Sequence, residues 1–134
     1  MARHVLLDTE LVLLRWDPHH SAVIMTRTEA ELPRGLDALR AFFKSLVTAL
    51  APICRPSNDF VIDSRASMGR NDDAFETVKR EFEHELFGGF KNVSVVLQSE
   101  VGRLQVQRYN DELRAQEMQV FPTVDEALKR PPSS

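Results

Sequence analysis

One polar loop holds most of the side chains that could bind a ligand or a partner. It spans residues 63–73 and follows a short apolar run, a place where ligands of open α/β sheets bind. Arg65, Arg70 and the backbone N–H groups of a following helix could receive an anion, and Gly69 would allow a close backbone approach. The candidate residues for binding a partner or a ligand are Asp63, Ser64, Arg65, Ser67, Gly69, Arg70, Asn71, Asp72 and Asp73.

The same loop also has an explanation that involves no ligand. Asp72 and Asp73 would already satisfy the positive end of the helix dipole, and they would repel a phosphate. An arginine of the loop could pair with Asp63 or with these capping carboxylates. The residues alone leave both interpretations open.

Catalytic and metal-binding patterns are weak. His19 and His20 lie in an expected turn with no further ligand at metal-binding spacing. Glu81 and His84 are spaced as in di-metal carboxylate bundles, but a second Glu-x-x-His is missing, so we interpret them as part of a solvated acidic helix face. Cys54 is the only cysteine and lacks a known cysteine signature, so we expect a small buried side chain. We expect no catalytic residue, no metal and no cofactor.

Length and charge narrow the class of protein. The chain has 134 residues and a formal net charge of −3, which suits one domain, expected at residues 1–130 with a disordered tail at 131–134. A net negative charge removes the usual electrostatic basis for binding nucleic acid. With no signal-peptide pattern and no membrane-spanning apolar run, we expect a cytoplasmic protein that does not insert into membranes.

The N-terminal third predicts strands and then a helix. Residues 5–8, 11–16 and 22–28 are rich in β-branched and apolar residues and are separated by turn residues, which favours an antiparallel meander. Trp16 ends one of these strands, and we expect it to be mainly a core residue. Residues 36–50 carry apolar side chains, including Leu36, at the spacing of an amphipathic helix.

The rest of the chain alternates strands with helices. Strands are expected at residues 60–63, 93–97 and 118–121, with helices after each. The first of these helices has Asp73 and Glu76 at capping-box spacing and ends at paired glycines, and the last has a capping box at residues 123–126. The middle helix carries Leu104 and Tyr109 on its apolar side. The predicted fold class is α/β, a mixed β-sheet with a strand meander at the N-terminus followed by alternating helices and strands.

This order of elements resembles the STAS superfamily, and in particular its divergent SpoIIAA-like branch, which has the anti-sigma-factor-antagonist fold. The resemblance rests on the buried strand Phe60-Val61-Ile62-Asp63, the polar loop, the N-capped helix and the strand at residues 93–97. In that family the loop and helix start form the partner-binding surface, and a serine or threonine there is phosphorylated by a partner kinase. The family's Asp-Ser-Ser-Gly or Asp-Ser-Thr-Gly signature is absent here, where residues 71–74 read Asn-Asp-Asp-Ala. Ser64 and Ser67 lie elsewhere in the loop, so the phosphorylation switch is not carried over.

The resemblance implies a non-enzymatic, cytosolic STAS-like regulatory domain that binds a protein partner in a bacterial signalling pathway. The alternative is a small-molecule binding domain of the same fold, with a lipid or an anion as ligand. A homodimer is possible through the edge of the N-terminal meander. Acidic residues crowd positions 72–85 and arginines flank them, a bipolar pattern that suits recognition of a protein.

Overall fold

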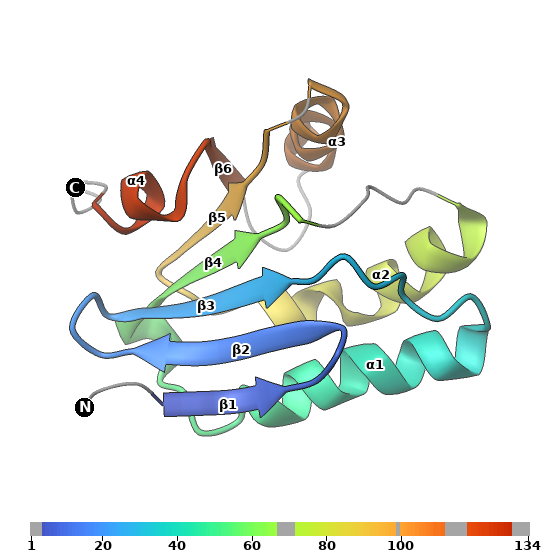
Figure 1. Cartoon of the computed structure of the whole chain (residues 1–134), viewed down its shortest axis with the longest axis horizontal. Coiled ribbons are helices and arrows are strands. Elements are labelled where there is room, and N and C mark those ends of the chain that lie inside the picture. The colour runs from blue at the N-terminus through green and yellow to red at the C-terminus, as the bar shows by residue number, and fades with distance from the viewer. Residues whose placement is uncertain (1–3, 67–71, 99, 112–117, 130–134) are drawn as a thin grey trace.

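The computed structural model describes residues 4–66, 72–98, 100–111 and 118–129. A six-stranded sheet follows the order of the chain, with β1 at one edge and β6 at the other (Figure 1). The strands are β1 (His4–Asp8), β2 (Val12–Asp17), β3 (Ala22–Arg27), β4 (Asp59–Asp63), β5 (Asn92–Val96) and β6 (Met118–Phe121). The helices are α1 (Leu36–Ala49), α2 (Asp73–Phe87), α3 (Glu100–Asp111) and α4 (Val124–Leu128), with a short 3-10 helix at Arg55–Ser57.

The pairing of the strands confirms the predicted fold class. Strands β1, β2 and β3 pair antiparallel as a meander, and β3, β4, β5 and β6 pair parallel. Helices connect the parallel strands, as a parallel pair requires. Helices α1 and α2 lie behind the sheet in Figure 1, and α4 lies in front of it. The protein is therefore an α/β structure with a mixed sheet.

The larger core lies between the sheet and helices α1 and α2. Phe60 of β4 has no exposed surface, and its ring stacks on that of Phe90 with 4.8 Å between centroids. Phe43 of α1 stacks on Phe82 of α2 at 5.8 Å, so the two helices also pack against each other. All apolar residues of β4 are buried, which confirms that the apolar run at residues 60–63 forms a buried strand.

A smaller apolar cluster lies on the opposite face. Ile24, Val61 and Val96 come from β3, β4 and β5, and Ala127 of α4 completes the buried set. Side chains alternate between the faces of a strand, so Val61 points to this cluster while Phe60 and Ile62 join the larger core. The short helix α4 is thus the cover of this face over the parallel strands.

The start of α2 corrects one prediction and the end confirms another. The N-cap is Asp72, whose carboxylate accepts a hydrogen bond from the Phe75 backbone N–H at 2.9 Å, so the predicted capping box of Asp73 and Glu76 is wrong by one residue. Three successive Asn and Asp residues are all good caps, and spacing alone does not choose among them. The helix ends before Gly88, as predicted. Thr123 caps α4 by accepting from the Glu126 N–H at 3.1 Å, as expected.

Several side chains lie in other environments than the apolar and charged patterns predict. Cys54 is exposed, because it lies in the turn before the 3-10 helix. Glu83 is buried although its neighbours on α2 form the expected solvated acidic face. Leu36 and Leu104 are exposed, because each projects from a helix that covers the core with its other side. Trp16 is half-buried, and its indole N–H donates to the Asn58 side-chain oxygen at 3.0 Å.

The close approach of the backbone at the C-terminal end of α2 gives a test of the fold. A Cβ added to Gly88 would lie 2.5 Å from the His84 carbonyl oxygen, whereas nothing lies within 4 Å of a Cβ at Gly35. We expect Gly88→Ala to lower the free energy of unfolding by more than about 1 kcal/mol, because the backbone must shift. Gly35→Ala, the matched control, should change it by less than that. Urea denaturation followed by circular dichroism measures the free energy of unfolding of both variants. Equal changes in the two variants would contradict the close packing of Gly88 against the His84 carbonyl oxygen.

Candidate functional site

The candidate site lies where β4 ends. Asp63 is the last residue of this strand, and it pairs in register with Thr26 of β3 and Val96 of β5. The Ser64 backbone N–H donates to the Val96 carbonyl oxygen at 3.1 Å, so the chain keeps its strand direction for one residue beyond β4. Asp63 follows Val61 by two residues, which places its side chain on the face that α4 covers.

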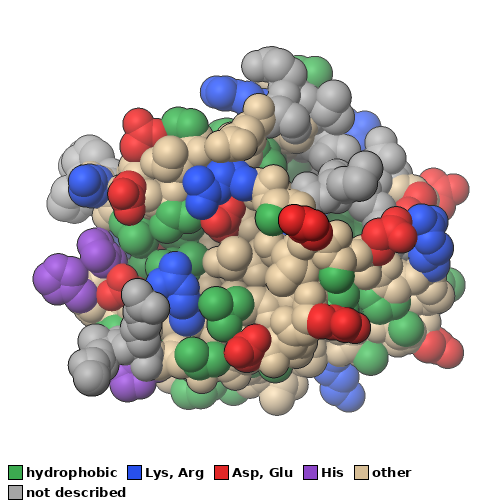
Figure 2. Space-filling model, viewed as in Figure 1, with side chains coloured by type: hydrophobic (Ala, Val, Ile, Leu, Met, Phe, Trp, Pro, Cys, Tyr) green, Lys and Arg blue, Asp and Glu red, His purple; other side chains and the backbone are tan. Residues whose placement is uncertain are grey.

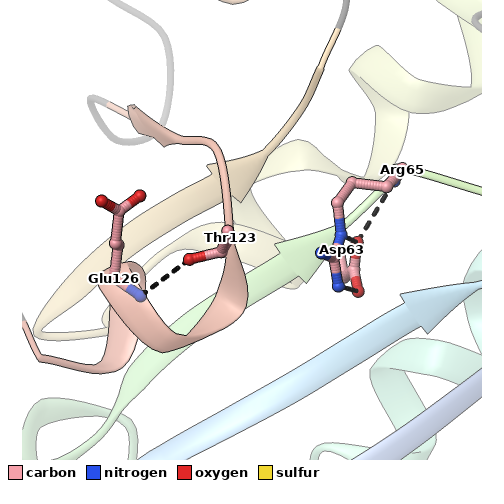
Figure 3. A network of polar contacts seen from close by, with 4 residues as sticks. All are labelled: Asp63, Arg65, Thr123 and Glu126. Carbon is pink, nitrogen blue, oxygen red and sulfur yellow. Dashed lines mark hydrogen bonds and ion pairs between the residues drawn. The ribbon is translucent and has the colours of Figure 1, made fainter.

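Arg65 folds back onto Asp63. Its Nε and Nη2 each donate to a different carboxylate oxygen of Asp63 at 2.9 Å (Figure 3). The Arg65 backbone N–H also donates to Oδ1 of Asp63 at 3.2 Å, which closes an Asx turn. The Asp63 side chain is only 9% exposed and that of Arg65 35% exposed. This bidentate pair fixes the first residues of the polar loop, because one carboxylate holds both the side chain and the backbone of Arg65.

The charge state of the pair follows from its surroundings. Burial alone would raise the pKa of Asp63, but the hydrogen bonds and the positive charge of Arg65 outweigh it and hold that pKa below its ordinary value. The hydrogen bond to Asp63 raises the pKa of Arg65. Both groups are therefore ionised over the whole physiological range of pH.

Two further charges act on this pair, and the sequence alone did not single them out. The positive charge of Arg15 on β2 helps to lower the pKa of Asp63, and the negative charge of Asp125 on α4 helps to raise that of Arg65. The alternation of β2 is the signal that could have found Arg15, because Leu14 is in the core and its neighbour must face the other side. For Asp125, a part of a capping box, no comparable signal exists in the sequence.

The predicted site residues divide into three groups. Asp63, Ser64 and Arg65 form the hydrogen-bonded turn described above. Asp72 is engaged as the N-cap of α2, and Asp73 is exposed in the first turn of that helix. Ser67, Gly69, Arg70 and Asn71 lie outside the described residues.

The geometry limits the chemistry of the site. Nε and one N–H of Nη2 of Arg65 already donate to Asp63, so an anion that contacted Arg65 in this pair would meet its Nη1 and remaining Nη2 N–H groups. Within the described ranges, no group of three or more His, Cys, Asp or Glu side chains is placed to hold a metal ion. His20 instead lies 2.8 Å from the carboxylate of Asp17 in its own turn, and His84 is exposed on α2. The turn formed by Asp63, Ser64 and Arg65 therefore holds polar groups in fixed positions.

Comparisons with known proteins do not assign this chain to a family. No protein-family model, no curated protein and no solved structure matches this chain. Across the described residues, every helix falls short of the length and apolar character that crossing a lipid bilayer requires.

The ion pair predicts a pH dependence of stability. Folding lowers the pKa of Asp63 from its ordinary value of 3.8, so the pair stabilises the fold fully above about pH 4 and loses this effect as the pH falls through the folded-state pKa. We expect Asp63→Asn to lower the free energy of unfolding by about 1–3 kcal/mol at pH 7, because a charged hydrogen-bond acceptor is lost. The difference from the parent protein should shrink below pH 4.

Urea denaturation at a series of pH values measures this difference. Asp8→Asn is the matched control, because Asp8 is an exposed residue at the end of β1. A difference between Asp63→Asn and the parent that does not change between pH 7 and pH 3 would mean that the pair does not form in solution.

Proposed function

We propose that this chain is a non-enzymatic STAS-like regulatory domain that binds a protein partner in the bacterial cytoplasm. The binding surface consists of the turn at residues 63–66 together with the exposed side of α2. The observation that carries the proposal is the bidentate pair of Arg65 and Asp63, which makes the turn a preformed polar surface. A preformed surface favours binding because less conformational entropy is lost on association.

The position of α2 supports the same proposal. Arg40 of α1 donates through Nε and Nη2 to the two carboxylate oxygens of Glu81, each at 2.9 Å, and this bond ties α2 to its neighbour. The ring stacking of Phe43 on Phe82 holds the two helices together from the core side. Thr77 and Arg80 on the outer side are exposed. The helix therefore presents its outer residues in a fixed orientation.

The proposal predicts which surface changes abolish partner capture. Ala66→Glu combined with Thr77→Glu adds two negative charges to exposed positions of the proposed surface, and we expect the partner to be lost because the like charges and bulk oppose docking. Ala41→Glu combined with Gln107→Glu adds the same charge at exposed positions of α1 and α3 and should retain the partner. Affinity capture from an extract of the source cell, with proteins identified by mass spectrometry, compares the two variants and the parent.

Two further measurements make this comparison decisive. Thermal unfolding by circular dichroism should give both variants the midpoint of the parent, which excludes loss of the fold as the cause. Native mass spectrometry of the purified chain distinguishes the proposal from binding of a lipid or an anion, because a retained small ligand would add its mass. An identical set of captured proteins for both variants would refute the proposed surface.

A further inference from the structure

Strand β6 forms one edge of the sheet and contacts helix α3 (Figure 1). The side-chain amide of Asn110, in the last turn of α3, donates to the Met118 carbonyl oxygen and accepts from the Met118 N–H, each at 2.8 Å. Two residues of an antiparallel ladder exchange the same two bonds when they form a hydrogen-bonded pair. One side chain therefore makes the backbone contacts that an added strand would make at Met118.

The backbone direction of β6 shows which of its residues face this edge. The Phe121 carbonyl oxygen accepts from the Leu97 N–H at 3.1 Å, so Phe121 faces the side of β5. Backbone groups of successive residues in a strand point to opposite sides, so those of Met118 and Val120 point away from β5. The bonds between Met118 and Asn110 agree with this direction. Asn110 thus engages one of the two residues of β6 whose backbone groups face the edge.

The two edges of the sheet differ in what protects them from added strands. Strand β1 has an irregular register between Val5 and Leu7 and ends at Asp8. Figure 2 shows acidic and His side chains among the apolar ones on the side of the molecule where β1 lies. Strand β6 instead pairs with β5 in a regular register, and none of its residues is charged. Bulges and charged side chains protect edge strands, so β6 depends on the contact with α3.

We propose that Asn110 blocks the β6 edge, and that this edge is a latent site of pairing with a second copy of the chain. Without the amide, β6 pairs antiparallel with β6 of the second copy about a twofold axis. Met118 of each copy then lies opposite Val120 of the other, and each such pair exchanges both backbone hydrogen bonds. A second copy fits this edge because uncharged strands bring no like charges together across the axis. The inference does not depend on the proposed function.

Removal of the amide tests the block. We expect Asn110→Ala to associate at least about tenfold more tightly than the parent, because the parent must break both bonds to Met118 before β6 can pair. Gln107→Ala, at an exposed position of the same helix, is the matched control and should associate as the parent does. Sedimentation velocity of the full chain over a range of concentrations measures the association. Equal association of Asn110→Ala and the parent would overturn the inference.

A proline shows whether the association uses the β6 edge. The Val120 N–H points away from β5, so Val120→Pro removes it without breaking the ladder between β5 and β6. Added to Asn110→Ala, it should return the association to that of the parent, because proline donates no hydrogen bond to an added strand. If the double variant associates as tightly as Asn110→Ala does, the contact lies on another surface and the inference is wrong.

Circular dichroism shows whether the variants fold. Alanine is a better helix former than asparagine, so we expect Asn110→Ala to keep α3 and to unfold within about 5 °C of the parent. Hydrogen exchange of the Met118 N–H in the dilute variant should be faster than in the parent, because its acceptor is lost. An Asn110→Ala chain that does not fold would mean that the amide holds α3 on the sheet, and this result would also overturn the inference.

Discussion

The burial of β4 on both faces is the constraint on which the rest of the structure depends. Helices α1 and α2 cover one face of this strand and α4 covers the other, so the burial of one strand requires helices on both sides of the sheet. Its apolar residues meet this need with Phe60 and Ile62 on one side and Val61 on the other. Asp63 ends the strand in the same buried position, and a buried carboxylate is costly unless it is paired. The Arg65 turn is therefore a consequence of how the strand ends.

The local patterns of the sequence predicted the elements and the fold class because their causes are local. Each of these signals depends on residues that are close together in the sequence. They are the alternation of apolar residues in the strands, the 3.6-residue period of α1 and the glycines after α2. The cap of α2 was displaced by one position because Asp72 and Asp73 are chemically equivalent caps. The prediction that Cys54 is buried was wrong, because the exposure of a side chain in a turn depends on what packs around the turn, which no local pattern encodes.

The site was predicted only in part for a related reason. Asp63 and Arg65 are two residues apart, and their pairing was one of two interpretations that the sequence allowed. The charges of Arg15 and Asp125 act on the pair from segments that are distant in the sequence. That they lie near the pair becomes known only from the sheet register and from the position of α4. Electrostatic neighbours across a sheet require its register, which one sequence does not provide.

The two edges of the sheet show how the same fold restricts its own associations. The side-chain amide of Asn110 in α3 donates to the Met118 carbonyl oxygen and accepts from the Met118 N–H, each at 2.8 Å, so it takes the place of a neighbouring strand beside β6. The opposite edge, β1, contains an irregular register between Val5 and Leu7, and such bulges discourage strand addition. A homodimer through the meander edge would have to accommodate that bulge. The Asn110 amide at one edge and the irregular register at the other thus both hinder association by added strands.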